Sequence, residues 1–287
     1  MRERLVFDVG KIVFEIVTDT PTYVSQILKE FGAFRSDKVP TIVIELRGDG
    51  LPDIDLRPEE KVFESEAIWS YYRRKNEHIF ALRTGGPQHP IFAIAVFDAP
   101  LGRGIIYSET SNRHLNYTPL SYPLSELLMI LWLVQEQGML VHACGIIDNG
   151  RGYLFSGNST HGKTTMARIW EDEGVILNDD RIILRQQGSQ IWMYSTPWHG
   201  DYQKVVAQSM LLDTIFFLSH AASNRLTRLN TLTSTHMLMT RCFPPLWDAA
   251  GMEAVLGVCG EVAQNTPCYE LGFVPDEAVI DFIRCAQ

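Results

Sequence analysis

The chain has 287 residues, of which 46% are hydrophobic and 21% are charged, and its formal net charge is −9. This length and composition are those of a globular chain with one large domain or two smaller ones. The negative charge disfavours a general attraction to nucleic acid or to an anionic membrane, so that any phosphate site has to be built locally.

The cysteines and the apolar segments indicate the compartment. The five cysteines are scattered and form no C-x-x-C pair, which favours reduced thiols packed in the core over a disulfide framework or a zinc site. The first ten residues lack the apolar run of a signal peptide, and the longest apolar stretch, residues 127–134, is too short to span a bilayer. These features predict a cytoplasmic protein with no membrane partner.

The first part of the chain, residues 1–118, is predicted to be a β-rich domain that recognises a substrate or a partner. Its apolar, β-branched and aromatic residues favour strands at residues 12–19, 41–48, 67–84, 91–98 and 104–109. Residues 67–84 are expected to form two strands around a polar turn. One helix, at residues 21–32, interrupts the strands.

The pattern changes after a polar segment, residues 110–121, where we place a domain boundary at 118/119. Residues 122–138 predict a buried amphipathic helix, with Pro123 near its start and Gly138 at its end. Beyond it, strands are expected at residues 139–148, 152–157, 174–180 and 181–197, with a helix at 164–173. Residues 119–287 therefore read as a domain that mixes strands and helices.

The stretch GNSTHGKTT, residues 157–165, follows a predicted strand and opens a predicted helix, as a phosphate-binding P-loop must. Its small residues let backbone N–H groups converge on phosphates, and the helix start adds a partial positive charge. Lys163 is expected to bridge the β- and γ-phosphates, and Thr164 to offer its hydroxyl to Mg²⁺. The predicted nucleotide-binding residues are Gly157, Asn158, Ser159, Thr160, His161, Gly162, Lys163, Thr164 and Thr165, of which His161 has no individual role.

Two adjacent carboxylates, Asp179 and Asp180, end the predicted strand 174–180, which directs them toward the loop. Such a pair suggests that one carboxylate holds Mg²⁺ and the other accepts a proton from an attacking hydroxyl. A solvated acidic turn is the alternative. His142 lies in a strand expected beside the loop strand, where residue type alone leaves a core histidine and a site histidine equally open.

The order of these parts over residues 139–185 resembles the catalytic domain of HPr kinase/phosphorylase: a histidine strand, a P-loop strand, G-K-[ST], a short helix and a strand ending in Asp-Asp. More distantly, the site resembles that of phosphoenolpyruvate carboxykinase, which shares this nucleotide-binding core. The resemblance implies an α/β fold, with a P-loop-containing mixed-sheet catalytic domain at residues 119–287 behind the β-rich domain. It also implies ATP at residues 157–164, Asp179 as the base, Asp180 as a Mg²⁺ ligand and His142 as the residue that orients the aspartate or the phosphate.

The chain departs from that family in several places. The family loop usually carries a glutamate where Thr165 stands here, so that the sequence leaves open whether phosphorolysis also occurs and how the metal is bound in detail. The family signature for docking HPr is not found, which makes HPr itself an unexpected target. The segment TPWHGD, residues 196–201, looks more like the diverse HPr-kinase-related chains found beside peptide-modifying enzymes. Its Trp198 and His199 are expected either to face a substrate or to form a turn that buries the tryptophan.

The predicted function is that of an ATP- and Mg²⁺-dependent kinase that transfers the γ-phosphoryl group to a hydroxyl. Lys163, Mg²⁺ and the loop amides would stabilise charge while Asp179 takes the proton. The expected acceptor is a serine of a peptide or small protein. Nucleic acid is not an expected partner. The resemblance makes a homo-oligomer possible, because the related kinases tend to assemble. Two alternatives stay open: a small-molecule kinase with the same core, and a nucleotide-gated peptide-binding or scaffold module without transfer.

Overall fold

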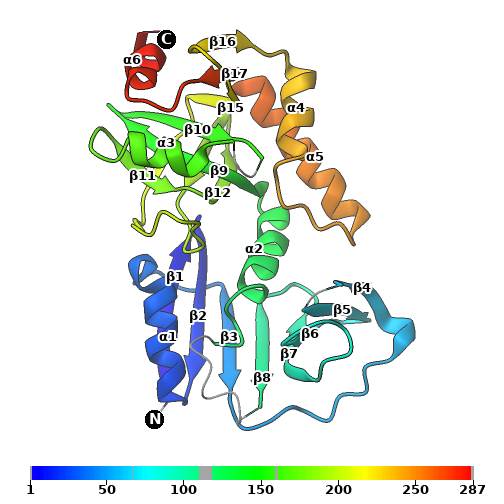
Figure 1. The fold of residues 1–287 in the computed structure, drawn as a ribbon. Coiled ribbons are helices and arrows are strands. Elements are labelled where there is room, and N and C mark those ends of the chain that lie inside the picture. Colours follow the sequence, from blue (N-terminus) through cyan, green and yellow to red (C-terminus); the bar gives the residue numbers. More distant parts are fainter. Residues whose placement is uncertain (1, 67, 110–117, 159–160, 286–287) are drawn as a thin grey trace. The chain divides into compact units, whose positions relative to one another are not determined.

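The computed structural model describes residues 2–66, 68–109, 118–158 and 161–285. Contacts group the chain into two compact units, Met1–Leu128 and Met129–Gln287. The division falls inside helix α2 (Leu124–Gln135), whereas the sequence places the boundary before this helix. Each unit combines helices with one mixed sheet (Figure 1).

The sheet of the first unit has the strand order β1-β2-β3-β8-β7-β6-β5-β4. Strands β2, β3 and β8 run parallel to one another, and the other neighbours are antiparallel. The strands are β1 (Glu3–Val9), β2 (Ile12–Thr18), β3 (Ile42–Arg47), β4 (Lys61–Glu64), β5 (Trp69–Arg74), β6 (Glu77–Arg83), β7 (Ile91–Asp98) and β8 (Arg103–Ser108). The predicted strands of this part are confirmed, and the structure adds β1 and β4.

Helix α1 (Pro21–Phe31) connects β2 to the parallel strand β3, as the sequence predicts. Proline suits the first turn of a helix because its missing N–H has no partner there. Tyr23, Ile27 and Phe31 recur at helical spacing and are buried. The ring of Phe31 packs on Phe7 and Phe14 of the first two strands, with centroids 5.6 and 5.8 Å away. This aromatic contact fixes α1 on the sheet.

The sheet of the second unit has the order β14-β13-β12-β9-β10-β15-β17-β16, and β11 also pairs with β9. Strands β10, β15 and β17 are parallel to one another. The strands are β9 (Gly138–Asp148), β10 (Arg151–Ser156), β11 (Val175–Asn178), β12 (Arg181–Gln187), β13 (Gln190–Tyr194), β14 (Ser209–Leu211), β15 (Thr214–His220), β16 (Arg225–Arg228) and β17 (Cys268–Phe273). The helices are α3 (Lys163–Ile169), α4 (Thr231–Met239), α5 (Ala249–Asn265) and α6 (Ala278–Cys285).

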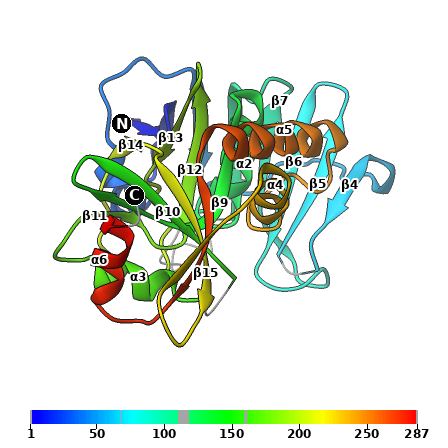
Figure 2. The same cartoon turned by 90° about the horizontal axis from the view of Figure 1, so that it is seen from above.

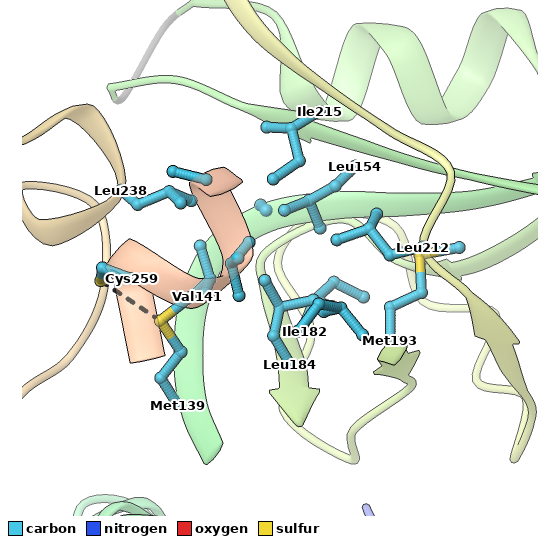
Figure 3. Packing of buried hydrophobic residues seen from close by; sticks show 14 of the residues in the cluster. Met139, Val141, Leu154, Ile182, Leu184, Met193, Leu212, Ile215, Leu238 and Cys259 are labelled. Atoms are coloured by element: carbon cyan, nitrogen blue, oxygen red, sulfur yellow. Dashed lines mark hydrogen bonds between the residues drawn. The ribbon is translucent and has the colours of Figure 1, made fainter. Parts of the chain in front are cut away.

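Helices cover both faces of this second sheet, with α3 and α6 on one side and α4 and α5 on the other (Figure 2). Strand β10 has apolar side chains for both faces of the sheet, because alternate side chains of a strand point to opposite faces. Leu154 packs in the cluster that contains Val141 of β9 and Cys259 of α5 (Figure 3). Its neighbours Tyr153 and Phe155 pack in the other cluster, with Trp170 after α3 and Ile283 of α6.

The structure confirms a helix in the predicted segment 122–138 and strands between 139 and 197. The helix, α2, is shorter than predicted, and Gly138 begins β9 instead of ending the helix. Helix α3 is shorter than the predicted 164–173, because the chain turns at Trp170 and Gly174 donates its N–H to the Trp170 carbonyl at 2.9 Å. No helix in the described part of the chain is long and apolar enough to cross a membrane.

Parallel strands end at the same edge of a sheet, and ligands of α/β sheets bind outside that edge. In the second unit this edge is formed by the carboxyl ends of β10, β15 and β17. The loop that follows β10 is the stretch GNSTHGKT. The parallel part of the sheet therefore determines where the candidate site lies.

Candidate functional site

The predicted P-loop leaves β10 after Ser156 and enters α3 at Gly162. Ser159 and Thr160, two of its predicted nucleotide-binding residues, lie outside the described residues. Gly162 has a φ of 96°, in the left-handed region that favours glycine. A Cβ at this position would lie 2.7 Å from the Phe273 ring of β17. The loop therefore needs glycine both for its backbone conformation and for its close approach to β17.

We expect Gly162→Ala to lower the free energy of unfolding by about 2 kcal/mol, because left-handed strain and overpacking against Phe273 add together. Gly188→Ala is the matched control, since Gly188 also has a positive φ, 62°, but has open space around its Cβ position. Gly188→Ala should lower the free energy of unfolding by only about 1 kcal/mol. Urea denaturation measures both values, and equal losses would show that the contact with Phe273 is unimportant.

The side chain of Lys163 lies folded into the loop. It is 7% exposed, and its Nζ donates hydrogen bonds to the carbonyls of Gly157 at 3.0 Å and Asn158 at 3.3 Å. Burial lowers the pKa of Lys163 from its ordinary value, while the carboxylates of Asp180 and Asp179 oppose that shift. The ammonium thus lies in the hollow of the loop and in the field of the acidic pair.

Asp179 follows β11 and is buried, with 1% of its surface exposed. Its Oδ2 accepts hydrogen bonds from the Thr164 hydroxyl at 2.9 Å and from the Tyr202 N–H at 3.1 Å. Its Oδ1 accepts one from the Gly200 N–H at 2.9 Å. The carboxylate is thereby joined to the residue that follows the P-loop lysine.

Asp180 has different neighbours. Its Oδ1 lies 2.8 Å from Nε2 of His142, and its Oδ2 accepts a hydrogen bond from Nη1 of Arg181 at 2.5 Å. Burial by itself would raise the pKa of Asp180, but the hydrogen bond with His142 and the charges of Arg181 and Lys163 bring it below its ordinary value. The side chain is 27% exposed. The pairing of β9 with β12 places His142 opposite Arg181 and so beside this carboxylate.

Asn178 organises the chain around the acidic pair, and sequence reasoning missed it. Its Oδ1 accepts hydrogen bonds from the N–H groups of Asp180 at 2.8 Å and Arg181 at 2.9 Å. Its Nδ2 donates to the carbonyls of Thr196 at 3.1 Å and Trp198 at 3.0 Å. One buried amide therefore holds the turn of the acidic pair and the TPWHGD segment together.

The TPWHGD segment, residues 196–201, supports Asp179 from the other side. Trp198 is buried and His199 is exposed. A Cβ at Gly200 would lie 3.0 Å from Oδ2 of Asp179, so the glycine permits a close approach to this carboxylate. The segment is thus a turn that buries a tryptophan and orients an aspartate.

Phe243 is a second residue that sequence reasoning missed. The guanidinium carbon of Arg181 lies 4.1 Å from the centre of its ring, and the His142 ring centroid is 6.1 Å away. An extended segment, residues 241–243, brings it there: the His142 N–H donates to the Arg241 carbonyl at 2.7 Å and the Phe243 N–H to that of Leu140 at 2.9 Å. The sequence holds no local signal for this pairing because it joins segments far apart in the chain.

The remaining predicted loop residues lie around the same edge of the sheet. Gly157 is buried and Asn158 is exposed. His161 has its Nδ1 3.1 Å from the Leu218 carbonyl of β15, which ties the loop to the neighbouring parallel strand. Thr165 of α3 is half-buried and lines a cavity. The structure therefore brings His142, Lys163, Thr164, Asp179 and Asp180 together.

The site offers few protein ligands for a metal ion. Across the described ranges, no three His, Cys, Asp or Glu side chains gather as a metal site. The oxygens that do meet are the Thr164 hydroxyl and the Asp179 carboxylate. Mg²⁺ usually takes one or two protein oxygens and completes its shell with substrate phosphates and water. The donor set fits a Mg²⁺ ion that is bound together with a nucleotide.

Comparison with known proteins gives likenesses to solved structures alone. No protein-family model matches the chain, and no curated protein matches it in sequence. Among solved structures, the HPr(Ser) kinase/phosphatase from Coxiella burnetii is 10% identical, covers 51% of this chain and 94% of its own, and has a TM-score of 0.33. At this TM-score the likeness carries no argument about fold or function.

Proposed function

We propose that the second unit is an ATP- and Mg²⁺-dependent kinase that transfers the γ-phosphoryl group to a hydroxyl acceptor. The observation that carries this proposal is that Lys163 lies near two carboxylates with different hydrogen-bond partners. Asp179 accepts a hydrogen bond from Thr164, and Asp180 contacts His142. Phosphoryl transfer asks a protein mainly for positioning and charge stabilisation, and these groups supply both.

The loop and Lys163 bind the phosphates. The ammonium would exchange its carbonyl partners for phosphate oxygens, which form stronger, charge-assisted hydrogen bonds. Thr164 and Asp179 would hold Mg²⁺, which neutralises charge on the phosphate oxygens when it is bound. Burial strengthens these interactions, because charges attract more strongly where water is excluded.

The sequence-based expectation makes Asp179 the base and Asp180 the Mg²⁺ ligand. The contacts favour the reverse assignment, which we propose here. Asp179 is buried and joined to the Thr164 hydroxyl, as a metal ligand next to a P-loop would be. Asp180 is partly exposed, so that an acceptor hydroxyl can approach it, and His142 orients it.

In this scheme the acceptor hydroxyl gives its proton to the Asp180 carboxylate while its oxygen forms a bond to the γ-phosphorus. The bond between the γ-phosphorus and the β,γ-bridging oxygen breaks, and ADP leaves. His142 is a positioning residue, because it acts on the carboxylate and not on the phosphate. The acceptor that we propose is a serine in a peptide or small protein, with the first unit as its recognition domain.

Calorimetry with Mg-ATP and a transfer assay test the proposal together. We expect Mg²⁺-dependent ATP binding, followed by transfer of label from γ-labelled ATP to members of a peptide library with a single Ser, Thr or Tyr. A parallel panel of small hydroxyl compounds tests the acceptor class, and transfer to these compounds alone would make the protein a small-molecule kinase. Absence of Mg²⁺-dependent nucleotide binding would contradict the kinase proposal itself.

A further inference from the structure

We propose that the cavity between α3 and α6 binds the nucleoside part of the phosphoryl donor. This inference rests on the proposed function, because it starts from a triphosphate held by the loop of Lys163. It adds a second subsite, about 980 Å³ in volume, formed by residues outside the phosphate-binding loop.

The cavity begins where the P-loop ends. Thr165, Arg168 and Asp172 line it from α3, and Pro275 and Ile280 line it from the α6 side. Figure 2 shows the two helices as neighbours on one face of the sheet. Thr165 directly follows Thr164, whose hydroxyl contacts Asp179. A triphosphate whose γ end lies at the acidic pair would thus reach this cavity with its α end.

The sheet topology supports the same placement. Strands β10, β15 and β17 are parallel, so the segment after β17 lies at the same edge as the P-loop after β10. Phe273, the last residue of β17, packs against Gly162 of the loop. Pro275 follows two residues later and lines the cavity. Crevices at the carboxyl edge of parallel strands are where α/β folds bind nucleotides.

Four charged side chains that line the cavity, Arg168, Asp172, Glu277 and Asp281, have no side-chain partner among the described residues. Neither Arg168 nor Asp172 makes a side-chain hydrogen bond or an ion pair to any residue in the described ranges. Arg284, which also lines the cavity, is by contrast fully engaged: it pairs with Asp148 at 2.7 Å and with Glu173 at 3.1 Å. Arg168 is therefore the lining cation that is left to a ligand, and the carboxylates left to it are Asp172, Glu277 and Asp281, which also line the cavity and make no ion pair in the described ranges.

The chemistry of these groups suits a nucleoside. A carboxylate such as Asp172 accepts hydrogen bonds from ribose hydroxyls, and a guanidinium such as Arg168 stacks against the face of the base. Pro275 and Ile280 offer apolar surface to the base. Ligand sites commonly have a volume of roughly 300–1,000 Å³, and this cavity lies within that range, with a lining that is mostly polar and charged.

The test compares Mg-ATP with Mg-tripolyphosphate, which carries the phosphates without the nucleoside. Calorimetry should show ATP binding at least about tenfold tighter than tripolyphosphate in the unchanged protein, because the cavity adds charge-assisted hydrogen bonds. Arg168→Ala and Asp172→Asn should each weaken ATP binding about five- to tenfold and leave tripolyphosphate binding unchanged. Both residues are exposed, so that the fold should tolerate the changes.

Arg228→Ala is the matched control. Arg228 is an exposed arginine of β16, paired in register with Tyr269 at the opposite end of β17 from Phe273, and its loss should alter neither affinity. Equal affinities for ATP and tripolyphosphate in the unchanged protein would overturn the nucleoside subsite and leave the P-loop proposal standing. The nucleoside subsite would also be overturned if Arg168→Ala and Asp172→Asn weakened the binding of ATP and of tripolyphosphate to the same extent. If neither ligand binds, both proposals fail.

Discussion

Asp180→Asn is expected to slow phosphoryl transfer by about 10²- to 10⁴-fold, the usual contribution of a general base. Mg-ATP affinity should change only a few-fold, because the P-loop and the Thr164–Asp179 contact do not depend on this carboxylate. Asparagine keeps the shape of the side chain and can still contact His142, but it cannot accept the proton. Single-turnover transfer of labelled phosphate and calorimetry with Mg-ATP separate the two effects.

Asp179→Asn is the matched comparison and should behave differently. The Asp179 carboxylate accepts hydrogen bonds from Thr164, Gly200 and Tyr202. The NH₂ group of an asparagine would face at least one of these three donors and could not accept its hydrogen bond. We expect a loss of about 2 kcal/mol in the free energy of unfolding and weaker Mg²⁺-dependent ATP binding. If Asp179→Asn abolishes transfer with ATP affinity intact while Asp180→Asn weakens Mg²⁺ binding, the sequence-based assignment of the two roles is the right one.

Lys163→Ala should lower Mg-ATP affinity by about 10- to 100-fold, because a charge-assisted hydrogen bond to phosphate contributes roughly 1.5–3 kcal/mol. The transfer rate should fall by a further 10²- to 10³-fold or so, as when a group that stabilises transition-state charge is removed. Calorimetry measures the first effect and the single-turnover assay the second.

Lys204→Ala is the control for the loss of a positive charge in the same unit. Lys204 is an exposed lysine that pairs with Glu171. The Lys204→Ala substitution should leave the affinity for ATP and the rate of phosphoryl transfer unchanged. Normal ATP affinity in Lys163→Ala would be incompatible with the loop acting as the phosphate site.

The parts of the site that the sequence predicts are those encoded within short segments. A strand, a Gly-rich loop with Lys163 and Thr164, and a helix start are adjacent in the chain, so their spacing alone indicates a P-loop. The acidic pair ends the strand that follows. The structure places these predicted residues together, and their roles stay predictions for the variants above.

The neighbours of the two carboxylates could not be predicted, because they come from distant segments. Gly200 reaches Asp179 through the turn that Asn178 holds, and Phe243 reaches Arg181 only through the pairing of residues 241–243 with β9. Side-chain periodicity gives the type of each element but not the order of strands in a sheet. The different environments of Asp179 and Asp180 therefore appear only in three dimensions.

The extended segment 241–243 connects a helix to the strand that carries His142. It joins α4 to the stretch before α5, and its backbone is hydrogen-bonded to β9 on both sides of Val141, next to His142. Helices α4 and α5 are consequently connected, through this segment, to the backbone of His142, whose side chain contacts Asp180. In the proposed kinase, a displacement of α4 would therefore be transmitted through this segment to the backbone of β9 beside the imidazole.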